Sequence, residues 1–186
     1  LLGEIEEDAL FLIDELDKET PLSVLKNHFL RYFRENGPSL VENLDRLPFP
    51  SYSPRELASY GQLYPVKIYR RLAWGHLMTS RGCPHQCIFC THMIRKSYGK
   101  RMRYRSPESI ISEINFLKDQ GVNIITFEDD NFSSSQEHVR KVCAALIERK
   151  ITIPWIAHAR IDEVAEELLK LVKRAGCVLL RFGIES

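Results

Sequence analysis

The sequence predicts an α/β fold whose core is a sheet of about four parallel strands. From residue 76 onward, short apolar segments without polar alternation are separated by segments with helical spacing, a pattern typical of parallel strands buried on both faces. A polar stretch directly follows each apolar segment. Because parallel α/β folds place their chemistry at the carboxyl ends of the strands, these stretches predict an active site. Periodicity alone leaves a doubly wound sheet and a partial barrel open.

The first 46 residues are predicted to form a helical and irregular appendage in front of this core. Residues 4–19 carry eight acidic residues and one lysine around an apolar stripe, which predicts an amphipathic helix with a solvated acidic face. Residues 22–44 fit either a second helix or a hairpin, because Asn36-Gly37-Pro38 breaks regular structure. Residues 47–75 open with the proline-rich stretch "LPFPSYSP" and predict an extended linker. The core is therefore assigned to residues 76–186.

Within the core, strands and helices are predicted in strict alternation. Ser106 is a typical helix N-cap, Pro107 suits the first helical position, and Gly121 ends the same helix. The predicted strands are 76–80, 123–127, 155–159 and 177–183, and the predicted helices are 107–120, a segment around 139–147, and 162–176.

Charge and composition exclude some classes of protein and leave others open. The net charge of +1 identifies no partner, although residues 95–105 hold six basic residues and no acidic one. This run fits either a solvated loop or a grip on an RNA backbone. We find no apolar run long enough to span a membrane and no secretory leader. The five cysteines are odd in number and clustered, which favours a reducing cytoplasm over a disulfide framework.

The stretch "SRGCPHQCIFC" places Cys83, Cys87 and Cys90 within one short loop after a predicted strand. Thiolates are soft ligands that suit zinc or an iron–sulfur cluster. Zinc would take His85 or His92 as its fourth ligand. A [4Fe–4S] cluster would keep one iron without a protein ligand, which is the open position that a catalytic site needs. The spacing also leaves a redox pair or a chance clustering of cysteines open.

The two remaining cysteines are predicted to have structural roles. Cys143 lies on the apolar face of a predicted helix, and Cys177 opens a predicted strand. Both are interpreted as small buried hydrophobic residues.

The cysteine loop resembles the Cys-x-x-x-Cys-x-x-Cys loop of the radical S-adenosylmethionine (radical SAM) superfamily. Four further stretches resemble segments of the subgroup that often carries an N-terminal cobalamin-binding domain: "LPFP", "FEDDNF", "ARID" and "AGCVLLRFGIES". The resemblance covers about residues 40–186 and implies a truncated, partial (βα) barrel, because the family's core usually has six βα units. It also implies that this chain is a fragment that follows a cobalamin-type domain and lacks the last strands.

The resemblance implies a [4Fe–4S] cluster and SAM as cofactors, with cobalamin possible in the longer protein. In this family, reductive cleavage of SAM yields a 5′-deoxyadenosyl radical, and the electron comes from a donor such as flavodoxin or ferredoxin. The substrate, a small molecule or another kind, stays unknown, and the reactions that the resemblance allows include cobalamin-dependent methyl transfer. The implied cluster ligands are Cys83, Cys87 and Cys90; the implied SAM contacts are Phe89 (adenine), one of Glu128, Asp129 and Asp130 (ammonium), Arg160 (carboxylate) and Glu185 (ribose).

Some of these residues also suit simpler structural roles. Asp130 or Asn131 could cap a helix, and Arg160 could pair with Asp162 at the surface. For the whole chain, the competing hypotheses are a zinc-binding, RNA-associated module and a non-catalytic fragment.

Overall fold

The computed structural model describes residues 40–50, 72–90 and 101–184 and contains the predicted parallel sheet. Its four strands are hydrogen-bonded in sequence order and run parallel: β1 (Trp74–Leu77), β4 (Ile124–Phe127), β5 (Trp155–Ala159) and β6 (Cys177–Phe182). The α/β class, the number of strands and their order are confirmed.

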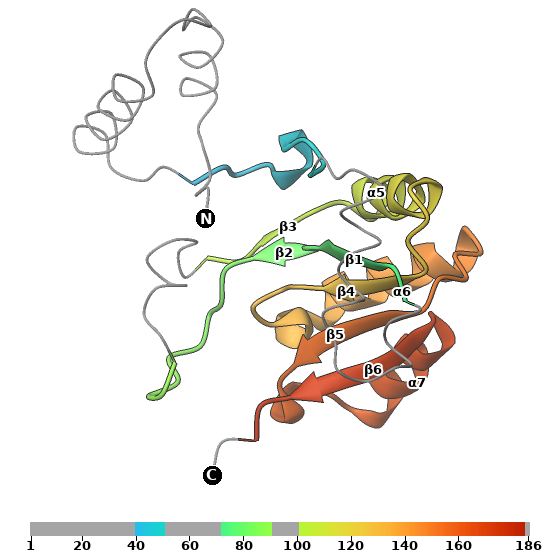
Figure 1. Ribbon diagram of the computed structural model, residues 1–186. Coiled ribbons are helices and arrows are strands. Elements are labelled where there is room, and N and C mark those ends of the chain that lie inside the picture. The colour runs from blue at the N-terminus through green and yellow to red at the C-terminus, as the bar shows by residue number, and fades with distance from the viewer. Residues whose placement is uncertain (1–39, 51–71, 91–100, 185–186) are drawn as a thin grey trace, which may run out of the picture.

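The three helices α5 (Pro107–Asp119), α6 (Gln136–Glu148) and α7 (Glu166–Arg174) all cover one face of this sheet (Figure 1). One cluster of buried side chains joins them to the sheet, with Ile110 and Ile114 from α5, Val139 from α6, and Ile125 and Trp155 from the strands. A doubly wound sheet would carry helices on both faces. Among the described residues, the helices lie on a single face, which identifies the partial barrel, one of the two architectures that periodicity leaves open.

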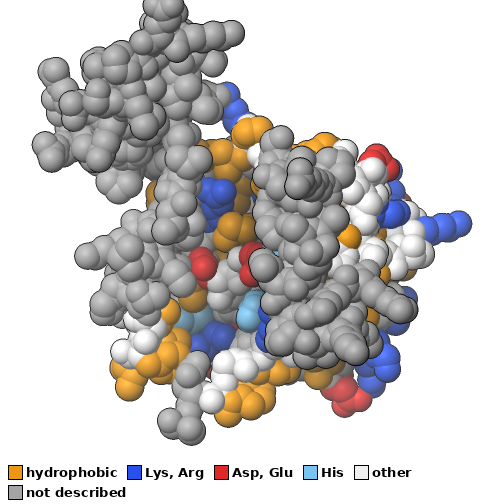
Figure 2. All heavy atoms as spheres, viewed as in Figure 1, with side chains coloured by type: hydrophobic (Ala, Val, Ile, Leu, Met, Phe, Trp, Pro, Cys, Tyr) orange, Lys and Arg blue, Asp and Glu red, His pale blue; other side chains and the backbone are white. Residues whose placement is uncertain are grey.

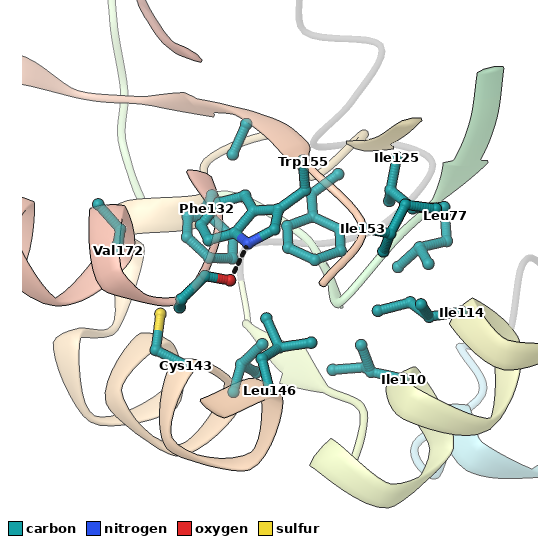
Figure 3. Close-up of a cluster of buried hydrophobic side chains, with 14 of the residues drawn as sticks. Leu77, Ile110, Ile114, Ile125, Phe132, Cys143, Leu146, Ile153, Trp155 and Val172 are labelled. Carbon is teal, nitrogen blue, oxygen red and sulfur yellow. Dashed lines mark hydrogen bonds between the residues drawn. The ribbon is translucent and has the colours of Figure 1, made fainter. Parts of the chain in front are cut away.

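Trp155 fixes the position of α7 relative to the sheet. Its side chain is 1% exposed, and its indole Nε1 donates a 2.8 Å hydrogen bond to the carbonyl oxygen of Ala175 at the end of α7 (Figure 3). The rings of Phe127 and Phe132 pack on it at centroid distances of 4.9 and 5.5 Å. The polar atom of this large side chain is thus satisfied inside the core, as burial requires.

Strand β1 lies unusually close to α5 and its following turn. A β-carbon added at Gly75 would stand 2.8 Å from Val122 Cγ1 and 2.9 Å from Ile125 Cδ1. Because side chains alternate along a strand, the neighbours Trp74 and His76 face the opposite side of the sheet. There Trp74 packs with Ile124 and Ile156 in a second, smaller apolar cluster.

The helix ends follow the predicted signals, with one exception. Ser106 accepts a 3.1 Å hydrogen bond from the Ser109 backbone, and Gly121 adopts a φ of 90° just after α5. The third helix was predicted from residue 162, but α7 begins at Glu166. Residues Ile161–Glu163 form a separate 3-10 turn, η5, because Glu163 is held by side chains beyond β4.

The sequence also missed a small antiparallel pair beside the main sheet. The predicted strand 76–80 divides into β1 and the short β2 (Ser80–Arg81), which pairs with β3 (Arg103–Tyr104). The break occurs where the backbone N–H groups of Thr79 and Ser80 turn to the buried carboxylate of Asp129.

The described part of the N-terminal appendage packs on the start of α5. Leu44 opens the 3-10 turn η1 (Leu44–Arg46) and is 2% exposed, while the Asp45 carboxylate accepts a 2.9 Å hydrogen bond from the Ser106 backbone. The predicted helix at 4–19 and the alternatives for 22–44 fall on residues 1–39, outside the described ranges, or at their edge. The boundaries at 46/47 and 75/76 stay predictions. None of the helices in the described ranges is long and apolar enough to cross a membrane.

Candidate cofactor site at the carboxyl edge of the sheet

The cysteine loop, residues 82–90, lies with the carboxyl ends of β4, β5 and β6 around one cavity. The volume of this cavity is about 710 Å³. Its polar and sulfur-bearing lining comes from the loop and from three strand ends: Cys83, His85, Gln86, Cys87, Cys90, Asp130, Asn131, His158, Arg160, Asp162 and Arg181. The predicted convergence of polar stretches at this edge is therefore what the described residues show.

The three loop cysteines are in the thiol form and lie in different surroundings. Burial raises the pKa of the Cys83 thiol, and a hydrogen bond from the backbone of His85 opposes that rise. The Cys87 sulfur accepts a 3.1 Å hydrogen bond from Arg160 Nη1, and Cys90 is exposed. No three metal-binding side chains in the described ranges converge on the position of a single ion. The site thus fits a cluster through its donor set of three thiols rather than through a preformed cage.

The three consecutive acids after β4 occupy three different environments. Glu128 points to the side of the sheet opposite α5, α6 and α7, where its Oε1 lies 2.7 Å from His76 Nδ1. That hydrogen bond lowers the pKa of Glu128, against the opposing effect of burial. The side chain lines a separate hollow of about 270 Å³ beside the segment Leu47–Pro50, not the cavity of the cysteine loop.

Asp129 is a structural residue in this geometry. Its side chain is 3% exposed and accepts three hydrogen bonds of 2.6 to 2.7 Å, from the backbone and hydroxyl of Thr79 and from the backbone of Ser80. Burial raises its pKa to about 6, although these hydrogen bonds act in the opposite direction. Both carboxylate oxygens are used to hold the β1–β2 connection.

Asp130 lines the cavity of the cysteine loop and has an unused acceptor. Its Oδ2 is buried and has no hydrogen-bond partner among the described residues. Burial raises the pKa of this carboxyl, and a backbone hydrogen bond from Gly82 and the charge of Arg81 lower it. Buried acceptors without partners are uncommon in native proteins, so this oxygen indicates a position for a ligand donor. The cap function belongs to Asn131, whose side chain accepts from the Ser133 backbone.

Of the other three predicted SAM contacts, the structure describes Arg160 and Phe89 but not Glu185. Arg160 pairs with Asp162 through two hydrogen bonds of 3.0 and 2.7 Å, which is its simpler structural role, while its third nitrogen reaches Cys87. Phe89 lies on the loop, is 63% exposed and lines the cavity. Glu185 lies outside the described residues.

Sequence reasoning missed Glu163, which connects three segments around the site. Its carboxylate accepts from His85 Nε2 at 2.6 Å, and from Asn131 Nδ2 and Ser133 Oγ at 2.7 Å each. Burial raises its pKa, but these hydrogen bonds outweigh burial and the pKa of Glu163 is lowered. Its position just after "ARID" at a strand end was the available signal.

Sequence reasoning also missed a group of polar side chains on the face of the sheet opposite α5, α6 and α7. Arg181 of β6 stands beside His158 of β5, with Arg181 Nη1 3.5 Å from His158 Nε2, and both charges lower the pKa of Glu128. Figure 2 shows acidic, basic and histidine side chains gathered near the centre of this face. A polar residue within the apolar strand 177–183 was the signal for Arg181.

The described part of the basic run is largely committed to the fold. Arg103 is 4% exposed and donates a 2.6 Å hydrogen bond to the Val41 carbonyl. Arg105 pairs with the buried Glu113. These side chains hold β3 and α5 in place, so Arg103 and Arg105 do not form an open basic surface. Residues 95–100 of the run lie outside the described residues, and the solvated loop and the RNA grip both stay predictions for them.

The sequence profile of the Radical SAM superfamily matches residues 77–186, more than half of the chain and all of the described cavity. The chain belongs to the radical SAM superfamily. Membership in this superfamily confirms the family, the enzyme class and the SAM and iron–sulfur cofactors that the resemblance of the cysteine loop implied.

Among curated relatives, an uncharacterized methyltransferase of Pyrococcus horikoshii is 32% identical over 99% of this chain and 39% of its own length. The cytidylyl-2-hydroxyethylphosphonate methyltransferase of Streptomyces wedmorensis is 30% identical over the whole chain and 37% of its own length. The anaerobic magnesium-protoporphyrin IX monomethyl ester cyclase of Synechocystis is 31% identical over 77% of this chain and 30% of its own length. The chain thus spans well under half of these relatives.

Among solved structures, the fold is similar to the radical SAM methyltransferase TsrM of Kitasatospora setae, solved with cobalamin and a [4Fe–4S] cluster bound. The TM-score is 0.57 at 23% identity, over 63% of this chain and 24% of TsrM. At this level of identity the likeness shows the radical SAM fold alone. It agrees with the partial barrel seen here.

Proposed function

We propose that this chain binds the [4Fe–4S] cluster and part of SAM in a radical SAM enzyme that transfers a methyl group with the help of cobalamin. The observation that carries the proposal is the shared cavity: three loop thiols and the unpartnered carboxylate oxygen of Asp130 line the same space. When bound, the cluster supplies the electron that cleaves SAM, and that electron would come from a donor such as flavodoxin or ferredoxin.

The roles of the chain's own residues follow from their surroundings. Cys83, Cys87 and Cys90 would hold the cluster, leaving one iron for SAM. Asp130 would accept from the ammonium group of SAM, because a cationic donor is the natural partner of a buried carboxylate oxygen without hydrogen bonds. Arg160 would neutralise thiolate charge at Cys87, where its guanidinium already donates to sulfur.

The remaining contacts and the shape of the site complete the assignment. Phe89 would pack against the adenine of SAM, and Glu185 would accept hydrogen bonds from the ribose hydroxyls. The apolar cluster of Trp74, Ile124 and Ile156 would form the floor of the sheet face opposite α5, α6 and α7 and exclude water from it.

Methyl transfer and cobalamin are supported by the named relatives rather than by the cavity. The two relatives that align with nearly the whole chain are methyltransferases, and TsrM was solved with cobalamin bound. The Synechocystis cyclase shows that a similar chain also serves ring closure. A small-molecule substrate fits all of these names.

Anaerobic reconstitution of the full chain tests the proposal. We expect about four iron and four sulfide per chain, lost in Cys87→Ala and kept in the control Cys143→Ala, whose thiol is buried in the core. With SAM, reductant and cobalamin, we expect 5′-deoxyadenosine or S-adenosylhomocysteine as products. Stoichiometric zinc in place of iron, or iron retained by Cys87→Ala, would refute the assignment.

A further inference from the structure

The cysteine loop reaches its position through side-chain contacts, since residues 82–90 form neither helix nor strand. Two contacts connect it to the turn after β5: Arg160 with Cys87, and Glu163 with His85. The Arg160 guanidinium is shared with Asp162 at the surface. The Glu163 contact is shorter, at 2.6 Å, and less exposed.

Glu163 is anchored on its other side by the turn after β4. Its Oε2 accepts from both Asn131 Nδ2 and Ser133 Oγ at 2.7 Å. The Ser133 hydroxyl in turn accepts a 2.9 Å hydrogen bond from the Arg160 backbone. Because one carboxylate thus joins the ends of β4 and β5 to the loop, its geometry is set by the sheet.

His85 transmits this anchoring to the cysteine loop. The Nε2–H of His85 donates to Glu163, and His85 lies two residues after Cys83 and two residues before Cys87. Holding the imidazole therefore restrains the segment of the loop that carries both thiols.

We propose that Glu163 is a positioning residue of the cluster site, which holds His85 and so fixes the loop segment between Cys83 and Cys87. This inference rests on the proposed function, in which both cysteines are cluster ligands. Outer partners that orient the ligands of a metal site set both metal retention and redox potential.

The test compares Glu163→Ala, Glu163→Gln and His85→Ala in the full chain after anaerobic reconstitution. The matched control is Glu166→Gln, which removes an acid from an exposed pair with Lys170 only one turn away. Three quantities are measured: the rate of iron release to a chelator, the midpoint potential of the cluster followed by electron paramagnetic resonance, and the melting temperature of the apoprotein.

We expect Glu163→Ala and His85→Ala to release iron about tenfold faster than wild type and to shift the midpoint potential of the cluster away from the wild-type value. The double variant should release iron no faster than His85→Ala alone, because both changes break one linkage. Glu163→Gln keeps one acceptor oxygen, so its rate of iron release and its midpoint potential should lie between those of wild type and Glu163→Ala. This variant provides the comparison if Glu163→Ala does not fold. Glu166→Gln should match wild type.

The two proposals fail in different ways. A wild-type chain that takes up no iron–sulfur cluster overturns the proposed function. A wild-type chain that holds the cluster, with Glu163 variants that match its release rate and potential, overturns this inference alone. A lower apoprotein melting temperature without a change in release rate or potential also overturns it, since Glu163 would then be purely structural.

Discussion

Asp129 and Asp130 are adjacent residues of the same type, so alanine at each position separates a structural acid from a ligand-binding one. Asp129→Ala removes the acceptor of three hydrogen bonds, two of them from the backbone N–H groups of Thr79 and Ser80. The Thr79 hydroxyl can turn to His138 Nε2, 3.2 Å away, but the two N–H groups stay buried without a partner. At roughly 1–3 kcal/mol for each, we expect a loss of about 3 kcal/mol in the free energy of unfolding.

Asp130→Ala should weaken SAM binding and have little effect on stability. It removes one buried oxygen that has no partner among the described residues and one acceptor of a backbone hydrogen bond from Gly82, so the free energy of unfolding should fall by only about 1 kcal/mol. If this carboxylate receives the ammonium group of SAM, its loss should cost about 2 kcal/mol of binding, or roughly thirtyfold in Kd.

Two assays measure the two quantities separately. Urea unfolding of the apoprotein, followed by circular dichroism, reports stability, and equilibrium dialysis of the reconstituted full chain reports SAM affinity. Asp129→Ala should shift the urea midpoint strongly, and Asp130→Ala should shift the Kd. Wild-type SAM affinity in Asp130→Ala would refute its assignment, and wild-type stability in Asp129→Ala would refute the hydrogen-bond argument.

Three further predictions concern other parts of the chain. Gly75→Ala should lower the free energy of unfolding by about 2 kcal/mol, because the new methyl group overlaps Val122 and Ile125; thermal denaturation measures it, and an unchanged melting temperature contradicts the close packing of β1. Burial lowers the pKa of His138 to about 4 from an ordinary 6.5, so the unfolded chain takes up this proton first as the pH falls. Stability of about 3 kcal/mol should therefore be lost between about pH 6.5 and pH 4, and His138→Gln should lack this part of the urea-midpoint profile; parallel profiles would contradict it. Alanine at any of the three cysteines of the loop should abolish iron uptake, whereas Cys143→Ala should keep iron and cost about 1 kcal/mol, and iron loss from Cys143→Ala would reverse the ligand assignment.

Much of the fold could be predicted from the sequence because the signals for its helices and strands are local. The Ser106-Pro107 start and the Gly121 end of α5 depend on backbone geometry within a few residues, and both agree with the structure. The strand Trp155–Ala159 was predicted at its observed bounds, because an uninterrupted apolar segment buried on both faces has no local alternative. The cysteine spacing identified the superfamily for the same reason, since its three ligands come from one loop.

The roles of individual polar residues depended on contacts between distant segments. Glu128, Asp129 and Asp130 are consecutive and chemically alike, so residue type cannot rank them. The sheet directs one toward His76, buries the second under Thr79, and leaves the third beside the thiols. Burial and hydrogen-bond partners decide which carboxylate remains available to a ligand.

The sequence by itself determined the parallel α/β core, the cysteine loop as the centre of the chemistry, and the edge of the sheet where polar residues gather, because each is encoded in short-range spacing. Only the tertiary structure decided that the helices cover a single face, that Arg160 is paired with Asp162, and that Glu163 holds His85. These features join residues up to 78 positions apart. Their pairing follows from the order and register of the parallel strands, which bring the strand ends together at one edge.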